Sequence, residues 1–252
     1  MRVFAISDMH FDYDINAQWV DNVSLYDFRD DILILAGDIS HDISRIRACI
    51  EQFSLRFKKA LFVTGNHDLW VVGKECESSF DKFDCVRQIV LDAGASMEPY
   101  HDAGLSIVPL LSWYDYSFGS PSERLCEIWM DYNACRWPHH FDDKDVNQYF
   151  LKKNEAYLHI RNQHVITFSH FLPRIDVMPS YIPPKYRVIY PVLGSDALDT
   201  QVRALQANTH VYGHSHVNQK IRISGVDYIN NAFGTPGEAH FTSRGLLCVY
   251  EH

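Results

Sequence analysis

The sequence lacks long apolar runs, CxxC pairs and an excess of positive charge. None of its apolar runs reaches the roughly 18 residues that a membrane-spanning helix needs, so no membrane partner is expected. Its six cysteines include no CxxC pair, and we expect free, structural thiols. Its 23 lysines and arginines are outnumbered by 32 aspartates and glutamates, which gives a formal net charge of −9. That charge excludes a broad basic surface for nucleic acid.

Signals for secretion and for division into domains are also missing. The first ten residues, MRVFAISDMH, contain no long apolar core and no small-residue cleavage site, so they are typical of a first strand. We therefore expect a cytoplasmic protein. No repeat, low-complexity tract or interdomain linker interrupts the 252 residues, a length that suits one large α/β domain. We predict a single domain over residues 1–252, and the oligomeric state stays open.

Short apolar runs alternate with helix-like stretches. The runs at 2–8, 31–38 and 60–68 are continuous, as expected of strands buried on both faces. Apolar side chains recur every three or four residues over 43–57, which predicts a helix and a parallel strand–helix–strand unit. Further helices are predicted at about 75–92 and 196–207. Further strands are predicted at 104–110, 164–170 and 209–216, with a hairpin around 224–225 and a final strand at the carboxyl end.

Residues 112–163 differ from this pattern because they are rich in aromatic residues and helical in character. We interpret them as a helical insert, and the proline-rich stretch after His170 as loop. The aromatic residues that open the insert could stack on a substrate or pack the insert onto the sheet, and the sequence leaves both alternatives open. They are Trp113, Tyr114, Tyr116 and Phe118.

Five of the strand-like runs end in polar clusters. Ligand sites in open α/β sheets form beyond the carboxyl ends of the strands. If these strands share a sheet, their ends converge on one crevice. Each cluster alone has an ordinary explanation as a turn, a cap or a structural histidine, but five in succession favour a site. The clusters are Asp8-Met9-His10, Gly37-Asp38, Gly65-Asn66-His67-Asp68, His170 and Gly213-His214-Ser215-His216.

The spacing inside the clusters suits a pair of metal ions. Asp8 and His10 are two residues apart, as are His214 and His216, and residues i and i+2 of an extended chain point to the same face. Asp38 offers two carboxylate oxygens that can bridge two ions. The glycines before Asp38, Asn66 and His214 permit the close backbone approach that a compact site requires.

This series of motifs, DxH, GD, GNHD, H and GHxH, resembles that of the calcineurin-like metallophosphoesterases. The resemblance implies a four-layer α/β/β/α sandwich, with the helical insert over a two-metal site. Carried over by motif, the first metal takes Asp8, His10, Asp38 and His216, and the second takes Asp38, Asn66, His170 and His214. His67 would be the proton donor to the leaving group, and Asp68 would orient it or support the loop. The implied metals are Mn, Fe or Zn.

One departure from the family pattern bears on the substrate. In the phosphoprotein phosphatases of this superfamily GD continues as GDxVDRG, whereas here it continues as GDISHDIS, with His41 in place of the aspartate. We therefore expect small phosphomonoesters, phosphodiesters or nucleotides as substrates. Asn66, His41 and Arg174, which lies four residues after His170, are candidate substrate contacts.

The charges predict hydrolysis by a bound hydroxide. Two divalent ions together with the carboxylates of Asp8 and Asp38 give the site a net charge of roughly +2. This charge attracts phosphate and lowers the pKa of bridging water. The expected function is a dimetal phosphoesterase. Two alternatives stay open: a catalytically silent protein-binding module of the same fold, and a metal-dependent hydrolase of another bond.

Overall fold

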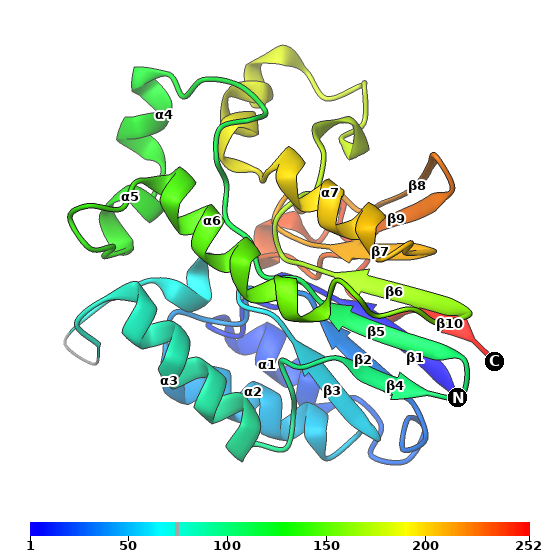
Figure 1. Cartoon of the computed structure of the whole chain (residues 1–252). Coiled ribbons are helices and arrows are strands. Elements are labelled where there is room, and N and C mark those ends of the chain that lie inside the picture. Colours follow the sequence, from blue (N-terminus) through cyan, green and yellow to red (C-terminus); the bar gives the residue numbers. More distant parts are fainter. Residues whose placement is uncertain (74–75) are drawn as a thin grey trace.

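The computed structural model describes residues 1–73 and 76–252. Within that part the chain forms two β-sheets that pack face to face between two layers of helices (Figure 1). The strand order is β10-β1-β2-β3 in the first sheet and β4-β5-β6-β7-β9-β8 in the second. The strands are β1 (Arg2–Ile6), β2 (Ile32–Leu35), β3 (Lys59–Phe62), β4 (Tyr100–Asp102), β5 (Leu105–Pro109), β6 (His164–Phe168), β7 (Thr209–Tyr212), β8 (Gln219–Ile223), β9 (Val226–Asn230) and β10 (Leu247–Glu251).

Strands β1, β2 and β3 of the first sheet bury both of their faces, which is why their sequences read as continuous apolar runs. The edge strand β10 is largely exposed. In β1, Val3 and Ala5 pack against the second sheet, whereas Phe4 and Ile6 pack against helices. Strands β1, β2 and β3 are parallel neighbours, and β5, β6, β7 and β9 are parallel neighbours in the second sheet. Their carboxyl ends therefore lie at one edge of each sheet.

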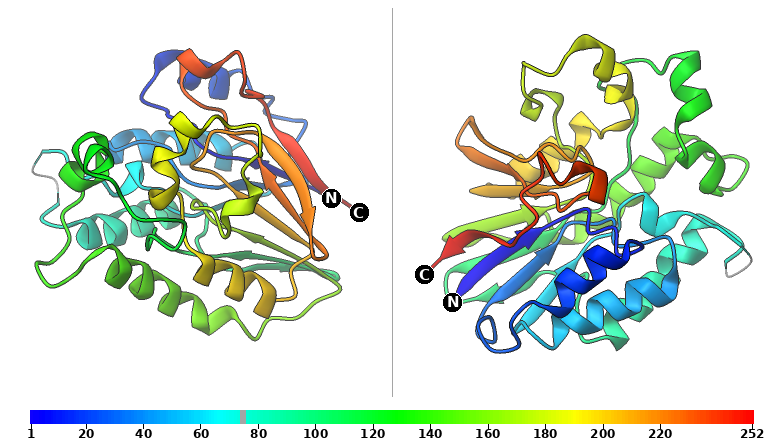
Figure 2. Two further views of the ribbon diagram at one scale, coloured as in Figure 1. Left: turned by 90° about the horizontal axis from the view of Figure 1, so that it is seen from above. Right: turned by 180° about the vertical axis from the view of Figure 1, so that it is seen from behind.

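Helices α1 (Asp14–Asp21), α2 (Ile43–Ser54) and α3 (Ser79–Asp92) cover the first sheet, and α6 (Asp143–Asn154) and α7 (Asp196–Ala204) cover the second (Figures 1 and 2). Side-chain caps mark where several helices begin. Asp42 accepts from two backbone N–H groups of α2, and Ser78 forms a capping box with Asp81 at the start of α3. The short helices are α4 (Glu123–Ile128), α5 (Asp131–Ala134), η1 (His67–Leu69), η2 (Glu155–Tyr157), η3 (Ile175–Val177), η4 (Pro184–Val192) and η5 (Pro236–Glu238).

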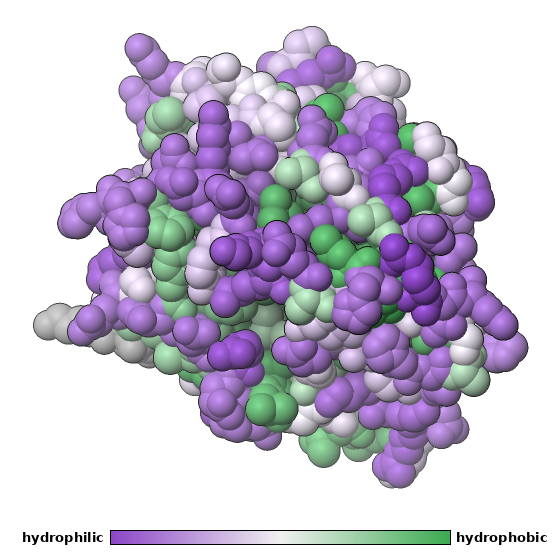
Figure 3. All heavy atoms as spheres, in the orientation of Figure 1, coloured by the Kyte–Doolittle hydropathy of each residue, from purple (hydrophilic) through white to green (hydrophobic). Residues whose placement is uncertain are grey.

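The four-layer α/β/β/α architecture is confirmed, with three differences in detail. The five motif-bearing runs are divided between two sheets and do not share one. Helix α3 begins at Ser79 and not near residue 75, which lies outside the described residues. Helix α1 and strand β4 were not predicted. The surface in Figure 3 is mostly hydrophilic, with small apolar patches between the charged side chains.

The insert at 112–163 carries α4, α5 and α6, and its aromatic residues contribute to the core. Trp113 and Tyr114 are fully buried and pack with Phe150 and Phe171, so the packing alternative holds for these two residues. Across the described residues, no helix combines the length and the apolar character that crossing a membrane demands.

Candidate metal centre

The polar clusters from both sheets meet at one place. The backbone N–H of Asp8 donates to the Gly37 carbonyl at 2.9 Å, which joins the ends of β1 and β2. The backbone N–H of Gly213 donates to the His170 carbonyl at 2.9 Å, which joins the ends of β6 and β7. The backbone N–H of His214 donates to the Asp8 carboxylate at 3.0 Å and so links the two sheets. The convergence predicted from the sequence thus forms across the junction of two sheets.

The first donor group contains Asp8, His10 and His216, whose ligand atoms lie within 4.8 Å of one another. Nε2 of His216 is 3.2 Å from the carboxylate of Asp8 and 3.2 Å from Nε2 of His10. On its other side, Nδ1 of His216 is 2.8 Å from Oε2 of Glu238. A carboxylate can only accept here, so Nδ1 of His216 carries a proton, and Nε2 is the nitrogen that faces Asp8 and a bound metal. Despite burial, the carboxylates of Asp8 and Glu238 raise the pKa of His216 well above its ordinary value.

The second donor group contains Asp38, His170 and His214, joined by the amide of Asn66. Nε2 of His170 lies 3.1 Å from Nδ1 of His214, 3.2 Å from Oδ1 of Asn66 and 3.4 Å from Oδ2 of Asp38. The outer nitrogens of both histidines donate to backbone carbonyls, at 2.9 Å to Ala36 and 3.1 Å to Val192. Four lone pairs therefore face one another, an arrangement that suits a cation among them.

The backbone at these ligands is in an uncommon conformation. Asp8, His10, Asp38, His214 and His216 have φ values of 53°, 41°, 58°, 65° and 51°. The left-handed region holds only a few per cent of non-glycine residues, and the described part of this chain has nine. Five of those nine are candidate ligands, so the unfavourable conformation is concentrated where the side chains converge.

Two of the glycines allow the close approach that the sequence predicted. A Cβ atom added at Gly65 would lie 2.1 Å from Oδ1 of Asp38, and one at Gly37 would lie 2.5 Å from Nδ1 of His170. Gly37 also has a φ of 85°, which side chains disfavour. Both positions therefore require glycine for the second donor group to form.

Two carboxylates that the sequence analysis missed orient the candidate ligands. Asp131, in α5 of the insert, accepts from Nδ2 of Asn66 at 2.8 Å, which turns Oδ1 of Asn66 toward His170. Burial raises the pKa of Asp131 to about 6. Glu238 binds His216 in the same manner, and because of its hydrogen bonds its pKa is lowered to about 2 despite burial. Motif spacing predicts neither Asp131 nor Glu238, because each lies far along the chain from the ligand that it binds.

The two aspartates among the candidate ligands differ electrostatically. Burial and the nearby carboxylates of Asp68 and Asp8 raise the pKa of Asp38 well above its ordinary value. Burial also acts on Asp8, but His216 outweighs it and holds the pKa of Asp8 below the ordinary range. The carboxylate of Asp38 is therefore the one that gains most from an additional positive charge.

His67 lies at the rim of the second donor group. Its ring stacks on Trp70 with the centroids 3.7 Å apart, and its Nε2 is 3.9 Å from the carboxylate of Asp38. Its side chain keeps 28% of its surface exposed, so a substrate can reach it. Burial and the neighbouring imidazoles lower the pKa of His67 to about 2.

Asp68 holds the two loops together and is fully buried. Its carboxylate accepts from the backbone N–H groups of Asp38, Ile39, Ser40 and Gly65, at 2.8 to 3.1 Å. These contacts fix the loop after β2 against the loop after β3. Of the two functions expected for this residue, its contacts agree with support of the loop.

The remaining candidate substrate contacts lie apart from the donor groups. The guanidinium of Arg174 is paired with Asp176 at 2.5 Å and with Asp199 at 3.3 Å. The ring of His41, 40% exposed, is 3.6 Å from the carboxylate of Asp12. Their roles at a substrate stay predictions.

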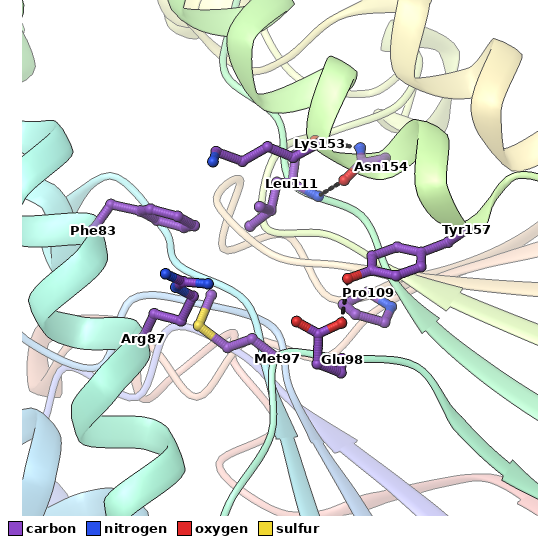
Figure 4. Close-up of a pocket in the computed structure, with 9 residues that line it drawn as sticks. All are labelled: Phe83, Arg87, Met97, Glu98, Pro109, Leu111, Lys153, Asn154 and Tyr157. Atoms are coloured by element: carbon purple, nitrogen blue, oxygen red, sulfur yellow. Dashed lines mark hydrogen bonds between the residues drawn. The ribbon is translucent and has the colours of Figure 1, made fainter.

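Two hollows lie on different sides of the molecule. The larger, about 540 Å³, is lined by His216 and Glu238 together with residues from 178–190 and 215–241. A smaller one, about 200 Å³, lies between α3 and α6, where Glu98 is hydrogen-bonded to Tyr157 (Figure 4). None of the motif residues lines the smaller hollow, so only the larger adjoins the candidate centre.

Comparisons with known proteins agree with this geometry. The sequence profile of the calcineurin-like phosphoesterase family matches residues 1–218. The acyl-carrier-protein phosphodiesterase PptH of Mycobacterium tuberculosis (strain ATCC 25618 / H37Rv) is 32% identical over 127 residues, which are 46% of this chain and 38% of that protein. The chain thus matches well under half the length of that relative.

A solved structure resembles the whole fold. The crystal structure of phosphopantetheinyl hydrolase (PptH) from Mycobacterium tuberculosis superposes with a TM-score of 0.81 at 22% identity, over 100% of this chain and 96% of that one. This likeness shows the fold, and the family profile covers most of the chain. Membership of the family implies divalent metal ions, for which the two donor groups offer ligands. The chain belongs to the calcineurin-like phosphoesterase family.

Proposed function

We propose that the chain is a two-metal phosphodiesterase. The observation that supports this most is that Nε2 of His170 lies within 3.4 Å of ligand atoms of Asn66, His214 and Asp38, beside a second donor group. Asp8, His10, Asp38 and His216 would hold one ion, and Asp38, Asn66, His170 and His214 the other. The donor set of imidazole and carboxylate suits Mn, Fe or Zn. When bound, two such ions supply a hydroxide nucleophile and positive charge toward phosphate.

The protein's own residues position the ester and move the proton. His67 is held by its stack on Trp70 and reaches the rim, where the leaving oxygen of a bound ester would lie. The negative charge of a phosphodiester beside this ring favours the protonated form of His67, against the burial that disfavours it. His67 then donates its proton to the departing alkoxide. Asp68 keeps the loops that carry Asp38 and His67 in register.

For the substrate, we propose the phosphodiester that joins a phosphopantetheinyl group to a carrier protein. The names given to PptH, the relative matched both in sequence and in structure, support this proposal. It departs from the expectation of a wholly small substrate, because one arm of this diester is a protein. A catalytically silent binding module finds less support, since every metal-ligand position and His67 are present.

The test compares the wild-type protein with Asp38→Asn, in the presence of Mn²⁺. The substrates are an aryl phosphodiester and a carrier protein that bears its phosphopantetheinyl group, with release followed by mass spectrometry. Asp38→Asn should abolish both reactions and lower the metal content, whereas Asp84→Asn, at an exposed carboxylate, should change neither. Turnover by metal-free wild-type protein would contradict the two-metal proposal. Hydrolysis of the aryl ester but not of the carrier protein would reject only the substrate.

A further inference from the structure

The larger hollow is continuous with the candidate metal centre. His216 belongs to the first donor group and also lines this hollow, as does its partner Glu238. Its volume of about 540 Å³ lies within the roughly 300–1,000 Å³ of ordinary ligand pockets. The hollow is therefore close enough to receive one arm of a phosphoester bound at the metals.

The walls of this pocket are mostly apolar and aromatic. Tyr181, Tyr186 and Phe241 line it while keeping 74%, 58% and 51% of their surfaces exposed. Large aromatic side chains exposed together around one hollow are typical of a binding site and not of a core. Met178 and Ile189 complete the apolar wall.

The charge of the pocket restricts what it accepts. Of the residues that the structure describes, no lysine or arginine lines it. The carboxylate of Glu238 is present instead, paired with His216 at 2.8 Å. A second phosphate or a carboxylate on the ligand would therefore meet the carboxylate of Glu238 and no lysine or arginine among the lining residues. The pocket suits an uncharged chain of alkyl and amide groups, to which the hydroxyl of Ser215 can donate. The amide of Asn218 is bound to the backbone of Ala232 in both directions.

The proposed proton donor identifies which arm of the diester the pocket holds. His67 does not line the pocket, and the departing oxygen must lie beside His67. Resting on the proposed function, we propose that this pocket binds the uncharged arm that stays on phosphorus after hydrolysis, and that it determines substrate specificity. In the reaction, hydroxide forms a new P–O bond and the P–O bond to the other arm breaks. The departing alkoxide takes the proton of His67, and the product is a phosphomonoester of the arm held in the pocket.

The experiment uses three 4-nitrophenyl phosphodiesters that differ only in the retained arm. One arm is methyl, one is a long uncharged alkyl-amide chain, and one is the same chain with a carboxylate at mid-length. In the wild type, kcat/KM for the uncharged long arm should exceed that for methyl by at least roughly 10-fold, and the carboxylate should remove this preference. Tyr181→Ala and Phe241→Ala should each reduce the preference by roughly 5-fold, mainly through KM for the long-arm ester.

Tyr26→Ala is the matched control, because Tyr26 is 72% exposed and does not line this pocket. It should leave the preference unchanged. Equal kcat/KM for the methyl and uncharged long-arm esters in the wild type would overturn the pocket while the proposed function stands. If no ester is hydrolysed, the proposed function fails by itself. The assignment of the pocket is then tested by calorimetry with the phosphonate analogue of the long-arm ester. Its binding should weaken in Tyr181→Ala, and a failure to bind the wild type would overturn the assignment.

Discussion

Asp131 connects the helical insert to the candidate centre, so its replacement tests how the second metal is held. Its Oδ1 accepts from Asn66 at 2.8 Å and from Trp70 at 2.6 Å, and its Oδ2 accepts from Trp129 at 2.8 Å. Asp131→Asn can keep one oxygen toward Asn66 and Trp70 while its amide group faces Trp129. Asp131→Ala removes all three acceptors and leaves the amide of Asn66 free to turn.

The size of each effect follows from these contacts. A buried donor without a partner costs about 1–3 kcal/mol. Asp131→Asn loses the part-buried bond to Trp129 and should lower the free energy of unfolding by about 1 kcal/mol or less. Asp131→Ala leaves one buried donor, at Asn66, and two part-buried indoles, so it should cost at least ~1–3 kcal/mol in a fold whose total stability is about 5–15 kcal/mol. Loss of the group that orients a ligand costs about 10–100-fold in metal affinity. The loss of affinity in Asp131→Ala should fall in this range, and the loss in Asp131→Asn should be at or below its lower end.

The assay is titration of metal-depleted protein with Mn²⁺, with thermal melting to confirm that each variant is folded. Trp129→Phe serves as the control, because it removes the same indole bond that Asp131→Asn loses and leaves Asn66 bound to Asp131. It should melt earlier and bind metal as the wild type does. If Asp131→Asn and Asp131→Ala both bind metal with wild-type affinity, Asp131 does not orient Asn66 for a metal. Equal losses in the two variants would assign the effect to charge and not to orientation.

Three further predictions address other parts of the centre. His67→Ala should keep both metals and lose about 10²–10⁴-fold in kcat/KM for alkyl esters but much less for nitrophenyl esters; equal losses on both would remove it from the acid role. Gly65→Ala should abolish metal binding and destabilise the fold, because its Cβ atom meets Asp38 at 2.1 Å. Gly245→Ala, whose Cβ atom meets nothing nearer than 3.8 Å, should keep the metals. Glu238→Gln should weaken metal binding by about 10-fold, measured by competition with a chelator, and an unchanged affinity would show that its bond to His216 does not matter.

The sequence was most informative where chemistry and local structure coincide. The polar residues after each buried strand interrupt an otherwise apolar pattern, so Asp8, Asp38 and His170 could be predicted to meet. The division into two sheets could not be read from the strands themselves. Both faces of β1 are apolar, with Val3 and Ala5 on one and Phe4 and Ile6 on the other, so hydrophobicity does not say which face meets a helix and which meets a second sheet.

Other features escaped prediction for identifiable physical reasons. Helix α1 buries only Asn16 and Val20, too few positions to give a helical period, and β4 is three residues long with partly exposed side chains. The contact of Asp131 with Asn66 joins positions 65 residues apart. It depends on how the insert packs against the core, which single-sequence periodicity does not specify.

The left-handed backbone at five of the candidate ligands limits how this centre could be reproduced elsewhere. A designer who placed the same aspartates and histidines on an ordinary helix or strand would supply the side chains but not their directions, because regular elements do not contain φ values near +50°. Transplanting the centre therefore means transplanting whole strand-to-loop turns, with the glycines before Asp38, Asn66 and His214 and with Asp68, which binds two of the loops. The structural element that a design must copy is therefore the whole turn, of which the ligand residue is one part.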